Sequence, residues 1–255
     1  MLLPDQRDRI EIVLVSPRNP LNIGAAARAM ANFGFPRLTV VAPYAPHWRE
    51  AKSAVGAPGL LATARETASI RQAVAHCTFV AGTGTLTHRM PEQPVTLLPE
   101  LGSIILRELE RSRGRTGGES RIALVFGAEK HGLTRDDLAY CQTLVEIPTD
   151  PQQPSMNLGQ AVAVCLYELT RSAASPDHPK PASPPAVSSA QLDRLADLVE
   201  QTMIAARYSP AAMQPANRHD LLLLLRRLAL SPGDLRRVLG IFRRILWRLG
   251  DHHIR

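Results

Sequence analysis

The first two thirds of the chain alternate short, continuous runs of apolar residues with longer stretches of helical periodicity. Continuous runs rich in β-branched residues are typical of strands buried on both faces of a parallel sheet, because a strand with one solvated face alternates apolar and polar positions. Five such runs predict strands at residues 10–16, 38–42, 79–82, 122–127 and 144–148. Apolar stripes between them predict helices at residues 22–32, 69–76, 99–111 and 158–171. The pattern therefore predicts an α/β fold with helices on both faces of a parallel sheet.

The last third of the chain has a different pattern. Residues 172–190 hold five prolines and almost no large apolar side chain, so they cannot pack a core and are predicted to be a linker. This linker separates a first domain, residues 1–171, from a C-terminal domain, residues 191–255. There, apolar residues recur at three- and four-residue spacing, and Ser231, Pro232 and Asp234 have the order expected at a helix start. The C-terminal domain is therefore predicted to be small and all-helical.

Composition excludes several classes of protein. The chain is 45% hydrophobic, which suffices for a core, yet no stretch approaches the ~18 uninterrupted apolar residues of a membrane span. The first residues lack the basic and apolar regions of a signal peptide. Cys77, Cys141 and Cys165 are odd in number and lack Cys-x-x-Cys spacing, which favours neither disulfides nor zinc. We therefore expect a soluble, cytoplasmic protein that binds neither a membrane nor a metal.

Charge is concentrated near the C-terminus. The formal net charge is +7, and residues 226–255 carry eight arginines against two aspartates. Such a basic segment on an otherwise balanced chain suggests a polyanionic partner, because neutralised phosphates release counterions. A solvated, arginine-rich helix face explains the same charge, so both interpretations stay open.

Three glycine-containing segments carry the candidate chemistry, and the first follows the opening strand. If Asn22 opens the next helix, Arg28 lies about two turns further on the same face, where an amide and a guanidinium could hold a ribose or a phosphate. The small residues 24–27 would let a substrate or another backbone approach closely. The alternative is a capping asparagine and an unrelated surface arginine.

The second and third segments also lie at predicted strand ends. Gly127 and Gly132 flank Glu129, which suggests a tight loop whose backbone approaches a ligand, although an ordinary strand-to-helix turn has the same composition. Residues 147–161 form a proline-rich loop in which Ser155 and Asn157 precede a helix. A helix cap explains one of these two polar residues, but not the whole loop.

Other motifs are incomplete. Residues 82–87 begin as a dinucleotide-binding fingerprint but lack its third glycine, which disfavours a nucleotide-dependent oxidoreductase. No Gly-x-Ser-x-Gly elbow is present, so hydrolase chemistry has no support. His252 and His253, at the chain end, are expected to be solvated.

Together, Asn-x-Gly-x-x-x-Arg after the first strand, Gly-x-Glu-x-x-Gly-Leu, and Ser-x-Asn before the last helix of the first domain resemble the three motifs of the SpoU/TrmH group of SPOUT RNA 2'-O-methyltransferases. The resemblance covers residues 10–171. Residues 223–227 and 240–246 of the helical extension are similar to members that methylate cytidine or uridine in the tRNA anticodon loop.

This resemblance implies a C-terminal trefoil knot in the first domain, an exception to the rule that folds avoid threading. It also implies S-adenosyl-L-methionine as the cofactor, tRNA as the substrate and a homodimer whose subunits complete each other's site. The catalytic residues it implies are Arg28, Asn22, Ser155 and Asn157. The cofactor-binding residues it implies are Gly82, Thr83, Gly84, Gly127, Glu129, Gly132, Ile147, Pro148, Ser155, Met156, Asn157 and Leu158.

A guanidinium stays protonated, so we expect Arg28 to orient the 2'-oxygen and stabilise its developing charge, with a substrate phosphate as one candidate proton acceptor. We expect RNA contacts from Arg28, Arg89, Arg226, Arg227, Arg236, Arg237, Arg243 and Arg244. Relatives carry an arginine where this chain has Leu86, and Arg89 or His88 is expected to replace it. The C-terminal helices dock on RNA, on the first domain or on a partner subunit. A non-catalytic SPOUT-fold RNA-binding protein and an rRNA 2'-O-methyltransferase remain alternatives.

Overall fold

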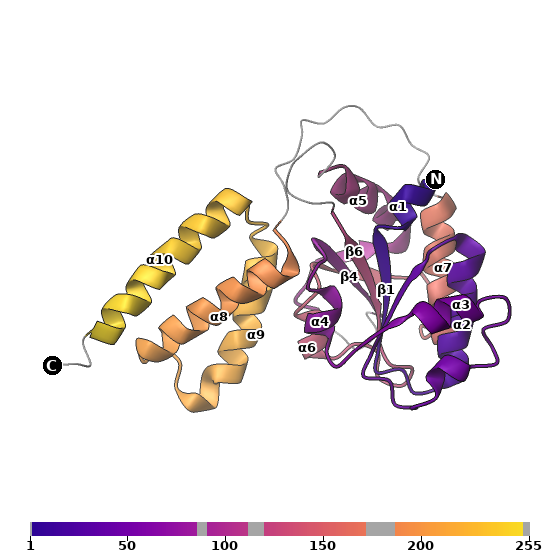
Figure 1. Ribbon diagram of the computed structural model, residues 1–255, viewed down its shortest axis with the longest axis horizontal. Coiled ribbons are helices and arrows are strands. Elements are labelled where there is room, and N and C mark those ends of the chain that lie inside the picture. The colour runs from indigo at the N-terminus through magenta and orange to yellow at the C-terminus, as the bar shows by residue number, and fades with distance from the viewer. Residues whose placement is uncertain (1, 86–90, 112–119, 172–186, 252–255) are drawn as a thin grey trace.

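The computed structural model describes residues 2–85, 91–111, 120–171 and 187–251 and contains one seven-stranded sheet (Figure 1). The strand order is β3-β2-β1-β6-β4-β7-β5, and every neighbouring pair is parallel. The strands are β1 (Ile10–Val15), β2 (Arg37–Val41), β3 (Arg65–Thr67), β4 (Phe79–Thr83), β5 (Val95–Leu97), β6 (Ile122–Phe126) and β7 (Thr143–Glu146). The predicted parallel α/β sheet is confirmed.

All five predicted strands are present, with ends that differ by one or two residues, but β3 and β5 were missed. Both are three residues long and lie at the sheet edges, where two of the three residues in each strand are exposed. Neither contains the continuous apolar run that marks a strand covered on both faces.

Helices cover both faces of the sheet. Side chains of the central strands point alternately to the two faces, so the core consists of two clusters, one on each face. Ile10, Ile12 and Leu14 of β1 point to one face, whereas Val13 and Val15 point to the other. The first face is covered by α2 (Pro20–Phe33), α3 (Pro58–Thr63), α5 (Leu98–Glu110) and α7 (Leu158–Arg171), with α1 (Pro4–Arg7) and the 3-10 turn η1 (Trp48–Glu50) beside them. The second face is covered by α4 (Ile70–Val74) and α6 (Arg135–Leu138).

Helices α2 and α7 pack very closely near their first turns. A Cβ atom on Gly159 would lie 2.6 Å from the Cβ of Ala25, so only glycine fits there. The small residues of α2 were expected to admit a substrate or another backbone: Ala25 is approached by Gly159 of α7, whereas a Cβ on Gly24 would lie 2.9 Å from the backbone nitrogen of Ala54. This packing places the beginnings of the two helices, and hence two of the motif segments, beside each other.

Residues 187–251 form a helical unit of α8 (Ser189–Ala205), η2 (Ala211–Met213), α9 (Gln214–Arg227) and α10 (Pro232–Asp251). Its own core joins Leu192, Leu195, Leu222 and Leu225 of α8 and α9 with Leu235 of α10. The predicted start of α10 is confirmed, because the Ser231 hydroxyl accepts a hydrogen bond from the Asp234 backbone at 3.1 Å. In Figure 1, α8 and α9 face α4 and α6 of the sheet domain, and α10 lies on the far side of the unit. Within the described residues, no helix has the length and apolarity needed to cross a bilayer.

The end of the predicted linker is packed rather than free. Val187 is buried, and the backbone N–H groups of Ser189 and Ala190 donate to the carbonyls of Cys77 and Ala75 at 2.8 and 3.0 Å. The unpaired N–H groups at the start of α8 thus meet unpaired carbonyls just beyond the end of α4. Residues 172–186 lie outside the described part.

Candidate functional site

The motif segments meet at the carboxyl ends of the parallel strands. Residues 16–19 follow β1, residues 127–133 follow β6 and residues 147–157 follow β7. Because the strands are parallel, these loops leave the sheet at the same edge, which is where α/β sheets commonly bind ligands. The three segments were each predicted to lie at a strand end, and the parallel sheet brings those ends together.

Glu129 is the centre of a hydrogen-bond cluster. Its carboxylate accepts the backbone N–H groups of Arg18 and Asn19 at 2.9 and 3.0 Å and the side-chain amide of Asn22 at 2.9 Å. Partial burial acts to raise the pKa of Glu129, but the bonds from Asn22, Arg18 and Asn19 outweigh it and hold that pKa below its usual value. Glu129 is therefore ionised at neutral pH and ties the loop after β6 to the start of α2.

Asn22 connects Glu129 with Asn157. While the Asn22 amide donates to Glu129, its side-chain oxygen accepts from the Asn157 amide at 2.8 Å. The Asn157 oxygen in turn accepts the Gly159 backbone N–H at 2.9 Å and so caps α7. One chain of hydrogen bonds thus joins all three motifs, across sequence separations of 107 and 135 residues.

Asn22 does not open α2, contrary to the prediction. Asn19 is the N-cap of α2, because its side chain accepts the Leu21 backbone N–H at 2.9 Å and Pro20 occupies the first helical position. Asn22 lies in the first turn, and its side chain is therefore available to Glu129 and Asn157.

Gly127 and Gly132 close the loop around Glu129. The N–H of Gly132 donates to the Ala128 carbonyl at 2.8 Å, and the two residues form an isolated antiparallel bridge. A Cβ atom on Gly127 would lie 2.1 Å from the Gly132 carbonyl carbon, and Gly132 has φ +65°. The tight loop predicted from the two glycines is therefore present, and a larger residue at Gly127 would push it apart.

A pocket of about 280 Å³ lies beside this loop, between the ends of β4, β6 and β7. It is lined by nine of the twelve residues expected to bind the cofactor: Thr83, Gly84, Gly127, Glu129, Gly132, Ile147, Ser155, Met156 and Leu158. It is not lined by Gly82, Pro148 or Asn157. Gly82 packs instead into the core, where an added Cβ would lie 2.9 Å from the Cys141 sulfur.

Several lining residues were missed: Thr85, Phe126, Ala128, Lys130, His131, Pro154 and Ala161. Each lies within or next to a motif segment or at a strand end. Their position at the carboxyl end of a strand could have identified them from the sequence. Lys130 and His131, the two residues between Glu129 and Gly132, bring nitrogen-bearing side chains to the pocket.

Arg28 is not brought into this cluster. Six positions at ~100° per residue put Arg28 about 120° around the helix from Asn22, so the expectation of a shared face is wrong. The Arg28 side chain is exposed and, within the described residues, makes no hydrogen bond or ion pair. It does not line the pocket.

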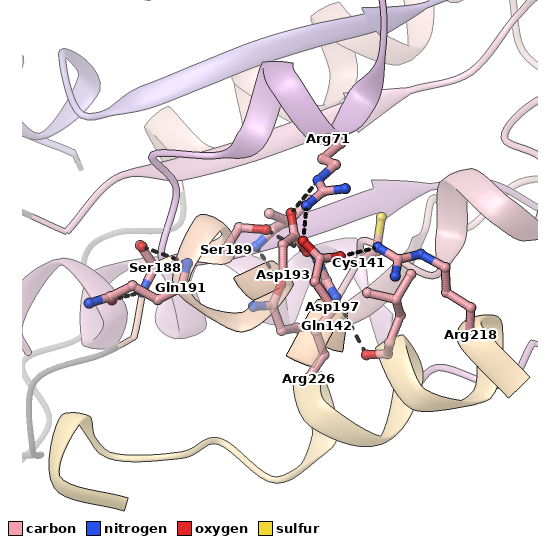
Figure 2. A network of polar contacts seen from close by, with 12 residues as sticks. Arg71, Cys141, Gln142, Ser188, Ser189, Gln191, Asp193, Asp197, Arg218 and Arg226 are labelled. Carbon is pink, nitrogen blue, oxygen red and sulfur yellow. Dashed lines mark hydrogen bonds and ion pairs between the residues drawn. The ribbon is translucent and has the colours of Figure 1, made fainter. Parts of the chain in front are cut away.

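Arg226, expected to contact RNA, lies instead in the junction between the helical unit and the sheet domain. Its side chain is 2% exposed, pairs with Asp193 at 3.1 Å, and has its guanidinium carbon 4.9 Å from the centroid of the Tyr140 ring. Figure 2 shows Arg71 on α4 reaching Asp193 and Asp197 of α8, with Arg218 and Arg226 of α9 nearby. In this structure, RNA cannot reach Arg226.

The other predicted RNA-binding arginines have different positions. Arg227, on α9, and Arg236, Arg237, Arg243 and Arg244, on α10, are exposed. Arg89 lies outside the described residues, as do Leu86 and His88.

One cluster in the described part has the composition of a metal site. Candidate ligand atoms of Glu92, His219 and Asp220 lie within 4.8 Å of one another. However, a guanidinium nitrogen of Arg135 lies 2.6 Å from Glu92 and 3.9 Å from Asp220. Arg135 of α6 thus contacts both carboxylates, and His219 of α9 lies 3.3 Å from Glu92, so these side chains form an ion-pair network that links α6 with α9.

Comparisons with known proteins agree with this arrangement. A sequence model of the SpoU rRNA Methylase family matches residues 9–167. A Pseudomonas aeruginosa relative named tRNA (cytidine/uridine/adenosine-2'-O-)-methyltransferase TrmJ is 41% identical over 163 residues, which cover 64% of this chain and 60% of the relative. A tRNA (cytidine/uridine-2'-O-)-methyltransferase TrmJ from Pectobacterium atrosepticum is 32% identical over 254 residues, covering 96% of this chain and 98% of the relative. The crystal structure of TrmJ from Z. mobilis ZM4 superposes with a TM-score of 0.78 at 28% identity, over 92% of this chain and 98% of that one.

Proposed function

The chain belongs to the SpoU methylase family, and we propose on that basis that it transfers a methyl group from S-adenosylmethionine to a ribose 2'-hydroxyl of tRNA. Relatives named for cytidine and uridine 2'-O-methylation support these nucleosides as targets. We propose a target in the anticodon loop because residues 223–227 and 240–246 are similar to family members that act there. The observation that carries the proposal is the hydrogen-bond chain from Glu129 through Asn22 to Asn157, beside a pocket lined by the family's glycine loops. A fold that had lost its catalytic role would have no reason to retain all three polar partners.

The pocket fits the cofactor chemically. Its volume of about 280 Å³ is close to the ~300 Å³ lower bound of small-molecule sites. Phe126, Met156 and Leu158 offer apolar walls, and the backbone at Gly127 is bare because no Cβ fits there. The ionised Glu129 contributes negative charge, which suits a sulfonium ligand. When bound, S-adenosylmethionine supplies the methyl group that the ribose oxygen attacks.

The chain's own residues then position the acceptor. Asn157 and Ser155 belong to the loop before α7, and Asn22 holds Asn157 in place. The exposed guanidinium of Arg28 orients the ribose 2'-oxygen and stabilises its negative charge, while a substrate phosphate takes the proton. Since Arg28 does not line the pocket of its own chain, we propose that a second copy of the chain supplies it, in a homodimer.

The strand order supports a knotted topology. Strand β6 lies between β1 and β4, and β7 lies between β4 and β5, so later strands are inserted between earlier ones. We propose that residues 1–171 form a knotted methyltransferase domain and that residues 172–190 link it to a helical domain, residues 191–255. The exposed arginines 227, 236, 237, 243 and 244 of that domain bind the RNA.

Replacing Arg28 tests the proposal directly. Loss of one preorganised donor typically lowers turnover ~100- to 1000-fold, so Arg28→Ala is expected to lose methylation by that factor. S-adenosylmethionine binding, measured by isothermal titration, should be unchanged, because the proposed role of Arg28 is to contact the ribose oxygen and not the cofactor. Arg107→Ala, at an exposed position of α5, is the matched control and should retain full activity. Unaltered methylation by Arg28→Ala would refute the assignment.

An rRNA substrate is the second candidate, because the family is named for rRNA methylation. Mass mapping of ribose methylation on tRNA and rRNA from cells with and without this protein separates the two. A methyl group lost from rRNA alone would overturn the tRNA assignment and retain the chemistry.

A further inference from the structure

One side of α10 carries a continuous arginine stripe. Arg236 and Arg243 are seven residues apart, as are Arg237 and Arg244, and Arg248 follows Arg244 by four. These spacings place all five on one side of a helix, and all five are exposed. Within the described side chains the stripe meets one carboxylate, Asp234, which lies 3.7 Å from Arg237 at the beginning of the helix. We refer to these five arginines as the α10 stripe.

Trp247 lies in the middle of the α10 stripe. It follows Arg243 by four residues and Arg244 by three, and 50% of its surface is exposed. The guanidinium carbon of Arg244 lies 4.2 Å from the centroid of its ring, and that of Arg248 lies 5.9 Å away. By contrast, the chain's other tryptophan, Trp48, is fully buried in the sheet domain. The indole is thus displayed in solvent among cations.

The opposite side of α10 packs the helix onto the rest of the helical unit. Leu235, Val238, Leu239 and Phe242 belong to the core of the helical unit or pack against it. The α10 stripe faces away from that core, and Figure 1 places α10 on the side of the unit remote from the sheet. The helix therefore does not need Trp247 or the five arginines for packing within the described chain.

Resting on the function proposed above, we propose that the α10 stripe binds unpaired RNA and that Trp247 stacks on one of its bases. Arginines neutralise the phosphates, whereas an indole offers a flat surface to any base that is not paired, and this combination is typical of single-strand binding. A paired helix would engage the arginines but would hide its base faces from Trp247. A membrane surface fits less well, because the main apolar side of α10 is already packed on the helical unit.

Tryptophan fluorescence tests the stacking. The chain has two tryptophans, and Trp48 is buried, so a change caused by added RNA reports on Trp247. We expect quenching by an unmodified tRNA transcript and by a short single-stranded oligoribonucleotide, and much weaker quenching by a duplex of equal length. Trp247→Phe should abolish the quenching and leave the Trp48 signal.

Affinity provides the second measurement, with a labelled single-stranded RNA. Trp247→Ala should weaken binding about 5- to 150-fold, the range for loss of one base–aromatic stack, and Trp247→Phe should restore most of it. Arg243→Ala and Arg244→Ala should each lower the salt dependence of log K by about 0.7. Arg194→Ala, at an exposed position of α8 outside the stripe, is the matched control and should bind as the parent does.

The outcomes separate the inference from the function on which it rests. RNA that binds tightly without quenching, or equally well to Trp247→Ala, overturns the stacking and leaves methylation intact. Quenching by anionic phospholipid vesicles but not by RNA overturns it in favour of a membrane surface. Absence of methylation despite quenching by RNA instead refutes the proposed function.

Discussion

Two arginines of this chain, Arg28 and Arg226, were both expected to contact RNA, but they lie in regions of opposite character. Arg28 is exposed on α2, outside the pocket and without a partner among the described residues. Arg226 is 2% exposed in the junction, where it bonds Asp193 and Ser189. A free guanidinium can bind phosphate or ribose, whereas a buried, paired one holds structure together. Burial and partners, which residue type and local charge do not reveal, decide the role.

The carboxylates of the two regions, the site and the junction, also have different partners. At the site, the Glu129 carboxylate accepts hydrogen bonds from an amide and two backbone N–H groups and forms no ion pair within the described residues, so its negative charge stays available to a ligand. In the junction, burial acts to raise the pKa of Asp197, but the guanidinium groups of Arg218 and Arg71 outweigh it and lower that pKa. The junction neutralises its charges internally. It is therefore suited to hold the helical unit in place rather than to bind RNA.

The largest expected effect is the loss of stability on replacing Asp193 in the junction. Asp193→Ala leaves the Arg226 guanidinium buried without its carboxylate, which typically costs ~3–5 kcal/mol in the free energy of unfolding. Denaturant unfolding measures the loss. Arg194→Ala, the exposed neighbour, should change stability by no more than ~0.5 kcal/mol. Equal effects of the two substitutions would mean that the helical unit is not docked in solution.

A double replacement tests whether the loss comes from the unpaired charge of Arg226. Asp193→Leu combined with Arg226→Met removes both charges and fills the junction with apolar side chains of similar size. Replacing a buried ion pair in this way is often neutral or stabilising, so the double variant should recover most of the stability that Asp193→Ala loses.

A further prediction concerns acid and Glu11, which lies at the opposite end of β1 from the site. Glu11, near the start of β1, is buried: burial acts to raise its pKa, but hydrogen bonds to His76 and Thr39 and the charge of Arg65 lower it from 4.5 to about 2. A carboxyl whose folded pKa is lowered stabilises the fold above its unfolded pKa, and this contribution is lost as pH falls from about 4.5 to about 2. A shift of this size corresponds to about 3 kcal/mol of unfolding free energy. Denaturant unfolding across this range should show the loss, and Glu11→Gln should flatten the profile.

The sequence revealed the segments that make the site but not the contacts between them. Continuous apolar runs identified β1 and β6, which are buried along their whole length. Two asparagines near the start of α2 were hard to distinguish as caps, although Pro20 favoured Asn19, because proline prefers the first helical position.

Contacts between distant segments needed the topology. Asn22 and Glu129 are 107 residues apart, and their bond depends on β1 pairing with β6. The burial of Arg226 depends on an aspartate 33 residues earlier. Arg226 directly follows the apolar run 221–225, and this position indicated burial. The prediction that Arg226 contacts RNA rested instead on the basic charge of the segment.

Asn157 gives the smallest but most specific change. Its oxygen caps α7 and its amide holds Asn22, so Asn157→Ala should lose ~1 kcal/mol of stability and also methylation activity. Asn157→Ser keeps a capping oxygen but has no amide to reach Asn22 in the same way. We expect Asn157→Ser to recover the stability, measured by thermal unfolding, and to leave methylation impaired. If activity returned together with stability, Asn157 would act as a helix cap alone, and the hydrogen-bond chain from Glu129 would end at Asn22.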